Sequence, residues 1–176
     1  MEELDRGYQF IVGSQPILVV AAHNFRQGRE GSMKAADMGT GDLARKICEK
    51  YKFYGLVSTR TQLDPNWYSS SNFREEVKEI IKKKDISLLI DLHGKSLAAK
   101  DLIELKANKV FKENYALKAG NFVDNKQLTL AEELDNTTPV IQIEIREDGR
   151  VPTIDEKKYA ESWEELNNLI TKLYEN

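Results

Sequence analysis

The chain has 176 residues, of which 40% are hydrophobic and 31% are charged, and its formal net charge is −3. These values are typical of a soluble globular protein, and the length predicts a single domain over residues 1–176. The slightly acidic balance argues against a nucleic-acid partner, because such partners require a basic surface.

Targeting signals and disulfides are not expected in this chain. The longest apolar run, at residues 17–22, is far shorter than the roughly 20 residues that a membrane-spanning helix needs. The first ten residues are acidic and lack the apolar stretch of a signal peptide, and the single Cys48 precludes an internal disulfide. We therefore expect a cytoplasmic protein without a membrane partner. Cys48 falls in a predicted amphipathic helix, which favours a small buried apolar residue over a nucleophile.

Strands and helices are predicted to alternate along the first half of the chain. Strand-like runs at residues 8–12 and 17–22 flank a segment that contains Gly13 and Pro16, which predicts a hairpin at one edge of the sheet. Further on, Asn72 followed by Glu75 predicts a capped helix start. The remaining elements of this half are a loop, a helix, a strand, a loop, the capped helix and a strand, at residues 24–32, 41–51, 55–59, 60–71, 72–84 and 86–92.

The second half contains one clear strand and one clear helix. Residues 139–145 alternate between apolar and polar side chains, which predicts a strand. Thr153 and Glu156 predict the capped start of a final helix, whose apolar face carries Tyr159, Trp163, Leu166, Ile170 and Leu173. Weaker patterns suggest a strand at 101–107 and helical turns at 111–117 and 127–134. The alternation predicts an α/β fold, with a mostly parallel central sheet covered by helices on both faces in three layers.

The chain has two histidines, and each follows an apolar strand. His23 comes after residues 17–22, and His93 ends the run ISLLIDLH at residues 86–93. Because the carboxyl ends of parallel strands meet at one edge of a sheet, the two imidazoles could share a divalent metal, and imidazole suits zinc. The alternative is that both are hydrogen-bonded core residues. Several acidic residues qualify as a third ligand: Glu30, Asp37, Asp42 and Asp91.

The predicted strand at 139–145 has one polar face. Its isoleucines point to one side, while Gln142, Glu144 and Arg146 point to the other. Either this strand is an exposed edge, which is the commoner explanation, or its polar face borders a cavity. In a cavity, Glu144 could act as a general base toward water that a metal activates.

Arginines near the predicted strand ends could bind a substrate carboxylate. A guanidinium group forms a planar, bidentate pair with a carboxylate, which lysine cannot do. Each of these arginines could equally be an isolated surface charge. The candidates are Arg26, Arg29, Arg60 and Arg146.

Several motifs occur in an order that resembles the N-formylglutamate amidohydrolase family, zinc hydrolases related in fold to zinc carboxypeptidases and aspartoacylases. The resemblance spans most of residues 17–146, and a further segment, LDPN at 63–66, partly resembles an Asp-Leu-Asn-Arg element of the family. The matching segments are VVAAHN at 19–24, KAADMGTG at 34–41, STR at 58–60, LIDLHG at 89–94 and VIQIEI at 140–145.

The resemblance implies a phosphorylase/hydrolase-like fold of the zinc carboxypeptidase type and a zinc ion as cofactor. His23, Asp37 and His93 would bind the zinc, with Glu30 as the runner-up for the acidic ligand. Glu144 falls where the wider group has its general base.

Arg60 falls where the family has an arginine near the substrate, and we add Arg26, Arg146 and Asn66 as candidate substrate-binding residues. The predicted function is a zinc-dependent amidohydrolase that cleaves the amide of a small N-formyl or other N-acyl amino acid. One alternative is a hydrolase of the metallopeptidase or cell-wall amidase type with the same site. Another is a non-catalytic binding protein that keeps the fold.

Overall fold

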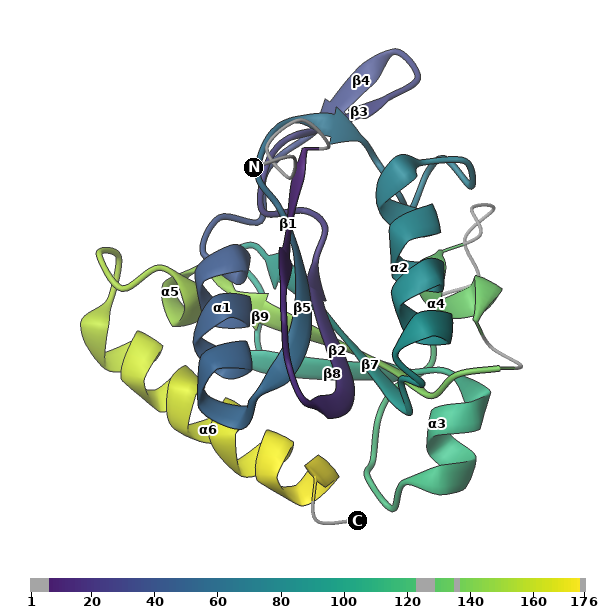
Figure 1. Cartoon of the computed structure of the whole chain (residues 1–176). Helices are drawn as coiled ribbons and strands as arrows, with labels where there is room; N and C mark the ends of the chain where they lie inside the picture. Colours follow the sequence, from purple (N-terminus) through teal and green to yellow (C-terminus); the bar gives the residue numbers. More distant parts are fainter. Residues whose placement is uncertain (1–6, 123–128, 135–136, 175–176) are drawn as a thin grey trace.

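A six-stranded sheet runs through the molecule (Figure 1). The computed structural model describes residues 7–122, 129–134 and 137–174. The four inner strands are parallel, whereas the two edge strands run antiparallel to their neighbours, so the sheet is mixed. From edge to edge the strands are β1 (Tyr8–Ile11), β5 (Phe53–Ser58), β2 (Gln15–Ala21), β7 (Leu88–Lys95), β9 (Val140–Arg146) and β8 (Ile103–Ala107).

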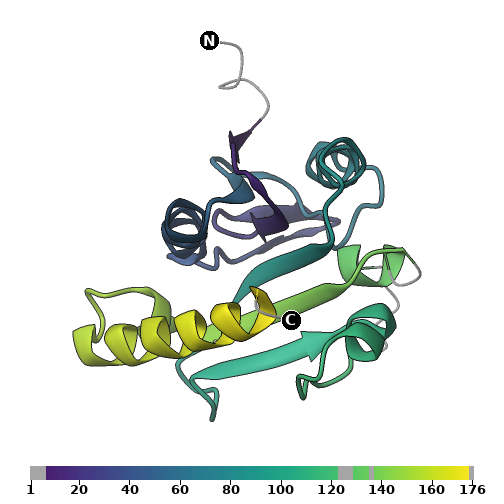
Figure 2. The ribbon, with the colours of Figure 1, turned by 60° about the horizontal axis from the view of Figure 1, so that its bottom comes forward.

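Two hydrophobic clusters form the core, and alternate residues of the inner strands belong to one cluster or the other. Helices α1 (Thr40–Tyr51) and α6 (Glu156–Tyr174) contribute to the first cluster, and α2 (Asn72–Lys83) and α4 (Leu130–Glu133) contribute to the second. Figure 2 shows α1 and α2 nearly end-on, on either side of the strands. The fold is therefore α/β, with helices packed against both faces of the sheet.

The inner strands have side chains that require burial on both faces. In β2, Val19 packs in the first cluster and Leu18 in the second, and both are fully buried. The neighbouring β7 begins in the same way, but its second face turns polar at Asp91 and His93. This change from apolar to polar residues along one face marks the carboxyl end of the sheet as the place where a polar site can form.

The predicted hairpin between the first two strands is wrong. Both strands exist, but β5 lies between them, and β1 pairs with β5 rather than with β2. The backbone amides of Ser14 and Gln15 donate to the carbonyl of Lys52, just before β5, at 2.8 and 3.1 Å. The connection is therefore bonded to the start of β5, and β2 takes the interior position that its apolar side chains need.

A second, three-stranded sheet forms where only loops were predicted. Its order is β4 (Ser32–Lys34), β3 (Gln27–Arg29) and β6 (Gln62–Leu63), and it projects at one end of the molecule in Figure 1. These strands are short and lack apolar alternation, so neither the tight hairpin of β3 and β4 nor the pairing of β3 with the distant β6 leaves a periodic pattern. This small sheet carries two of the cations described below.

Two predicted helix caps are shifted by one or two residues. Ser71, not Asn72, caps α2 and accepts a hydrogen bond from the amide of Arg74. The side chain of Asp155, not Thr153, accepts from the amide of Lys158 at the start of α6. Ser, Thr, Asp and Asn all serve as N-cap residues, and the backbone conformation decides which of several neighbouring ones caps the helix.

The weaker patterns correspond to β8 and to α3 (Lys109–Asn114) and α4, although the predicted start of the last lies outside the described residues. The additional short helix α5 (Glu147–Arg150) was not predicted. Among the described residues, no helix has the length and apolar character that crossing a membrane requires.

Candidate metal centre

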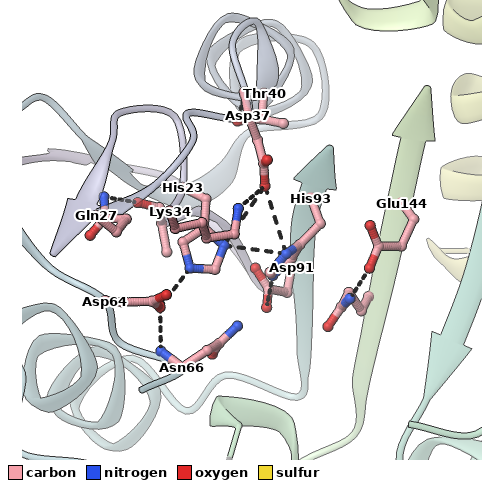
Figure 3. A network of polar contacts seen from close by, with 12 residues as sticks. His23, Gln27, Lys34, Asp37, Thr40, Asp64, Asn66, Asp91, His93 and Glu144 are labelled. Atoms are coloured by element: carbon pink, nitrogen blue, oxygen red, sulfur yellow. Dashed lines mark hydrogen bonds and ion pairs between the residues drawn. The ribbon is translucent and has the colours of Figure 1, made fainter. Parts of the chain in front are cut away.

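The two histidines face each other at the carboxyl end of neighbouring parallel strands. His23 lies two residues after β2 and His93 lies within β7, and their Nδ1 atoms are 3.3 Å apart (Figure 3). Both side chains are buried, and their ring planes are nearly perpendicular, with centroids 4.7 Å apart. Two imidazole nitrogens in this arrangement can bind one ion.

Asp37, just before α1, completes a triangle with the two histidines. Its Oδ2 lies 3.8 Å from Nδ1 of His23 and 3.9 Å from Nδ1 of His93. The amide of Asp37 donates to the carbonyl of His23 at 2.7 Å, and its own carbonyl accepts from the hydroxyl of Thr40, so its backbone is held on both sides. Ligand atoms around a tetrahedral zinc ion are about 3.3–3.5 Å apart. The three groups form a candidate metal site, and a donor set of two imidazoles and a carboxylate suits zinc.

A second carboxylate stands behind each histidine. Nε2 of His23 lies 2.8 Å from Oδ1 of Asp64, and Nε2 of His93 lies 2.9 Å from Oδ2 of Asp91. A carboxylate at this nitrogen requires that Nε2 carry the proton. Nδ1, which faces Asp37, is therefore the atom of each ring that could bind an ion, as in metal-binding histidines.

The two imidazoles differ in charge although both are buried. Burial lowers the pKa of His23, and the hydrogen bond to Asp64 offsets only part of that shift. Burial also disfavours the charged form of His93, but the carboxylates of Asp91, Glu144 and Asp37 raise its pKa to about 9. Burial alone would raise the pKa of Asp37, but Lys34 and the histidines hold it below its usual value. Of the two rings, His93 therefore favours the charged form, and a bound cation would displace its additional proton.

Two cations from the small sheet pair with the acids of this site. Nζ of Lys34 lies 2.9 Å from Oδ2 of Asp37, and Nε of Arg29 lies 2.6 Å from Oδ2 of Asp64. The guanidinium of Arg29 also lies over the ring of Trp67, 5.2 Å from its centroid. Burial would raise the pKa of Asp64, but hydrogen bonds from His23, Arg29 and the amide of Asn66 hold it well below its usual value.

A cavity of about 270 Å³ opens beside the two histidines. The polar face of β9 lines this cavity through Gln142 and Glu144. That face is therefore polar because it borders a cavity, and not because β9 is an exposed edge strand. Glu144 is the register partner of His93, and Oε1 of Glu144 accepts from Nζ of Lys106 at 3.2 Å. The remaining lining residues are Arg29, Lys34, Asn66, Phe122 and Thr129.

The other candidates for the acidic ligand lie elsewhere. Glu30 is exposed in the turn between β3 and β4. Asp42 is exposed on α1 and pairs with Arg45 at 3.0 Å. Asp91 contacts the Nε2 atom of His93, on the side of the ring away from the triangle. Of the four acids considered, Asp37 is the one whose oxygen joins both Nδ1 atoms.

Of the four arginines considered for binding a substrate carboxylate, Arg29 lines this cavity, whereas Arg26, Arg60 and Arg146 do not; the candidate Asn66 also lines it. Arg26 and Arg60 are exposed, and Arg60 lies beside Gly7. Both oxygens of Asp148 bind Arg146, at 2.8 and 2.9 Å, which directs its guanidinium along the surface. The cations that the cavity does contain come from strands β3, β4 and β8.

Three contributing residues were not named as site residues from the sequence. Asp64 lies in the LDPN segment, which only partly resembles a family element, and Lys106 lies in a weakly predicted strand, where only strand pairing brings it opposite Gln142. Arg150 is buried, and its guanidinium donates to the carbonyls of Ile145 and Met38, next to Asp37. Burial lowers the pKa of Arg150. Its carbonyl contacts support the segment that presents Asp37.

Cys48 has the inert role that was predicted. It is buried in the first core cluster, and burial raises the pKa of its thiol to about 12. A thiol with so high a pKa is not a nucleophile at neutral pH.

No protein-family model and no curated protein sequence matches this chain. Among solved structures, it is similar to the Atu2144 gene product of Agrobacterium tumefaciens, with a TM-score of 0.65, 14% identity and coverage of 98% of this chain and 95% of that one. Bacteriophage poly-γ-glutamate hydrolase matches with a TM-score of 0.46, 14% identity and coverage of 82% and 73%. The zinc-free form of YNDL matches with a TM-score of 0.40, 17% identity and coverage of 82% and 74%.

The Atu2144 match concerns the fold alone, and the two TM-scores below 0.5 carry no argument about this chain. The resemblance to N-formylglutamate amidohydrolases is compatible with the α/β fold and with the candidate metal site, and it has no family-level sequence match behind it.

Proposed function

We propose that this protein is a zinc-dependent amidohydrolase whose ion is held by His23, Asp37 and His93. The observation that carries this proposal is the buried triangle of two Nδ1 atoms and one carboxylate oxygen, with edges of 3.3, 3.8 and 3.9 Å, beside a cavity. The carboxylates behind both histidines support it, because they select the tautomers that a metal needs.

A bound zinc ion would lower the pKa of water to about 7 and would polarise a substrate carbonyl. Glu144 is the general base in this proposal, because it lines the same cavity and pairs in register with His93. Its carboxylate would accept a proton from the attacking water and would deliver it to the leaving amine. The ammonium of Lys106, which donates to Oε1, would hold the carboxylate in place.

The substrate we propose is a small N-acyl amino acid, N-formyl amino acids included. Three cations line the cavity, namely Arg29, Lys34 and Lys106, against one carboxylate, Glu144. Each of these cations already pairs with a carboxylate of the site, and their remaining N–H donors could bind the carboxylate of a substrate as a further partner. A cavity of about 270 Å³ favours a small substrate over the larger ones of metallopeptidases or cell-wall amidases.

Metal analysis of the reconstituted protein tests the metal centre. We expect about one zinc ion per chain in the wild-type protein and its loss in His93→Ala, because a ligand is removed. Glu30→Gln is the matched control: this acid was a rival ligand, lies in the exposed turn and should leave the zinc content unchanged. A reconstituted wild-type protein without zinc would contradict the proposal.

A panel of N-acyl amino acids then tests the reaction. Glu144→Gln should keep the zinc and lower kcat by about 100-fold or more, as loss of a general base does. If the zinc-loaded protein turns over no member of the panel, the alternative of a binding protein that keeps the fold is favoured.

A further inference from the structure

One carboxylate oxygen in the candidate metal centre could bind either the ion or a lysine. Oδ2 of Asp37 is the atom that closes the triangle with the histidines, and the same atom lies 2.9 Å from the ammonium of Lys34 (Figure 3). Lys34 stands on β4, and its side chain is 20% exposed while that of Asp37 is 9% exposed. The pair therefore lies at the wall between the buried triangle and the cavity.

The other acid–cation pair of the site is built differently. Asp64 uses Oδ1 for His23 and Oδ2 for Arg29, so each partner has its own oxygen. Asp37 offers the same oxygen to Lys34 and to the ion. An ammonium group and a divalent cation bound to one oxygen would repel each other strongly in a buried site.

We propose that Lys34 is an internal competitor for the metal, which binds the ligand oxygen of Asp37 when no ion is present and must leave it when one binds. This inference rests on the metal centre proposed above. Without an ion, the ammonium group of Lys34 neutralises the negative charge of Asp37. Once displaced, it would face the cavity that it already lines, where it could pair with the negative charge of a substrate.

The side chain can make this move without a change in the fold. The backbone of Lys34 is held in β4 by pairing with Gln27. Four methylene groups, joined by rotatable bonds, separate that backbone from the ammonium group. The ion binds only the form in which Lys34 has left Asp37. The free energy of breaking that pair therefore lowers the measured affinity for the metal.

The test is zinc affinity, measured by competition with a chromophoric chelator. Lys34→Met removes the competitor and should bind zinc more tightly than wild type, on the order of tenfold. Lys34→Arg keeps the charge and should stay close to wild type. Lys106→Met is the matched control, because this lysine lines the same cavity but contacts Glu144 rather than the triangle, and it should change the affinity by less than about twofold.

Equal or weaker zinc binding by Lys34→Met would overturn the inference, since it would mean that the lysine supports Asp37 as a ligand or has no influence. Near-UV circular dichroism checks that the variant is folded, and Lys34→Gln replaces it if it is not. If wild type binds zinc and His93→Ala does not, but Lys34→Met is unchanged, this inference fails and the metal centre stands. If neither wild type nor Lys34→Met binds zinc, both fail together.

Discussion

Each histidine of the candidate site depends on a carboxylate that does not itself touch the ion position. Asp91 and His93 both lie on β7, two residues apart, so their side chains emerge on the same face of the sheet. Their hydrogen bond is internal to one strand, whereas Asp64 reaches His23 from a loop. These acids act by fixing the ring orientation and the tautomer, and metal affinity should reflect their charge.

We predict that Asp91→Asn weakens zinc binding by about 10–100-fold, the range typical for such partners of metal ligands. The amide keeps the shape of the side chain but removes the negative charge that makes the imidazole a stronger donor. Chelator competition measures the effect. Asp42→Asn, on the exposed face of α1, is the control and should bind zinc like wild type, and an unchanged affinity in Asp91→Asn would contradict this role.

At the scale of the elements, one buried arginine joins two helices and a loop. Arg74 on α2 is fully buried and pairs with Glu133 on α4. Its guanidinium also donates to the carbonyls of Pro65 and Thr129, each at 3.0 Å. Because Pro65 follows Asp64 directly, this arginine holds the loop that carries the partner of His23.

We predict that Arg74→Met destabilises the protein by about 3 kcal/mol or more, because buried carbonyls lose their donor and Glu133 loses a charge partner. Urea denaturation measures the change. Lys83→Met is the control on the same helix: its pair with Glu79 is exposed and should contribute less than about 1 kcal/mol. Equal effects of the two substitutions would contradict the assignment.

The same pair gives a pH dependence with a defined sign. Burial alone would raise the pKa of Glu133, but Lys78 and Arg74 hold it below the usual value of 4.5. A lowered folded-state pKa contributes stability above pH 4.5, and that contribution is lost as the pH falls through the folded-state value. The stability of wild type should therefore fall more steeply below pH 4.5 than that of Arg74→Met.

At the scale of the whole molecule, two segments more than one hundred residues apart meet beside Asp37, the proposed acidic ligand. Gly39, at the start of α1, has φ +86°, and a Cβ atom there would lie 2.2 Å from the carbonyl oxygen of Arg150. Arg150 in turn donates to the carbonyl of Met38. The approach of α1 to α5 thus depends on a residue without a side chain, and it fixes the segment that presents the acidic ligand.

We predict that Gly39→Ala lowers the free energy of unfolding by about 2–5 kcal/mol, as the sum of left-handed backbone strain and overpacking. Gly31→Ala is the control, because Gly31 also has a positive φ of +69° but nothing lies within 4 Å of its Cβ position. It should cost only about 1–2 kcal/mol. Thermal and urea unfolding compare the two variants. Similar decreases in the free energy of unfolding would show that the close approach to Arg150 does not contribute to the effect of Gly39→Ala.

Much of the fold is readable in the sequence because strands and helices leave local periodic patterns. The apolar runs of β2 and β7, the alternation of β9 and the apolar stripes of α1, α2 and α6 all fall where they were predicted. His23 and His93 could be named as candidates for the same reason: each comes at the end of such a strand, and the ends of parallel strands meet at one edge. Asp37 was one of four acids that the pattern left open, and the family resemblance favoured it.

The tertiary structure alone decided which strands are neighbours and which charges reach the cavity. The insertion of β5 between β1 and β2, and the pairing of β3 with β6 that brings Arg29 to Asp64, depend on contacts between distant segments. Such pairing follows from burial and backbone hydrogen bonding summed over the whole chain, and no single stretch of sequence carries its pattern. For this reason the histidines and Arg29 could be named as candidates from the sequence, whereas the roles of Lys34 and Lys106 and the pairing of Arg29 with Asp64 could not.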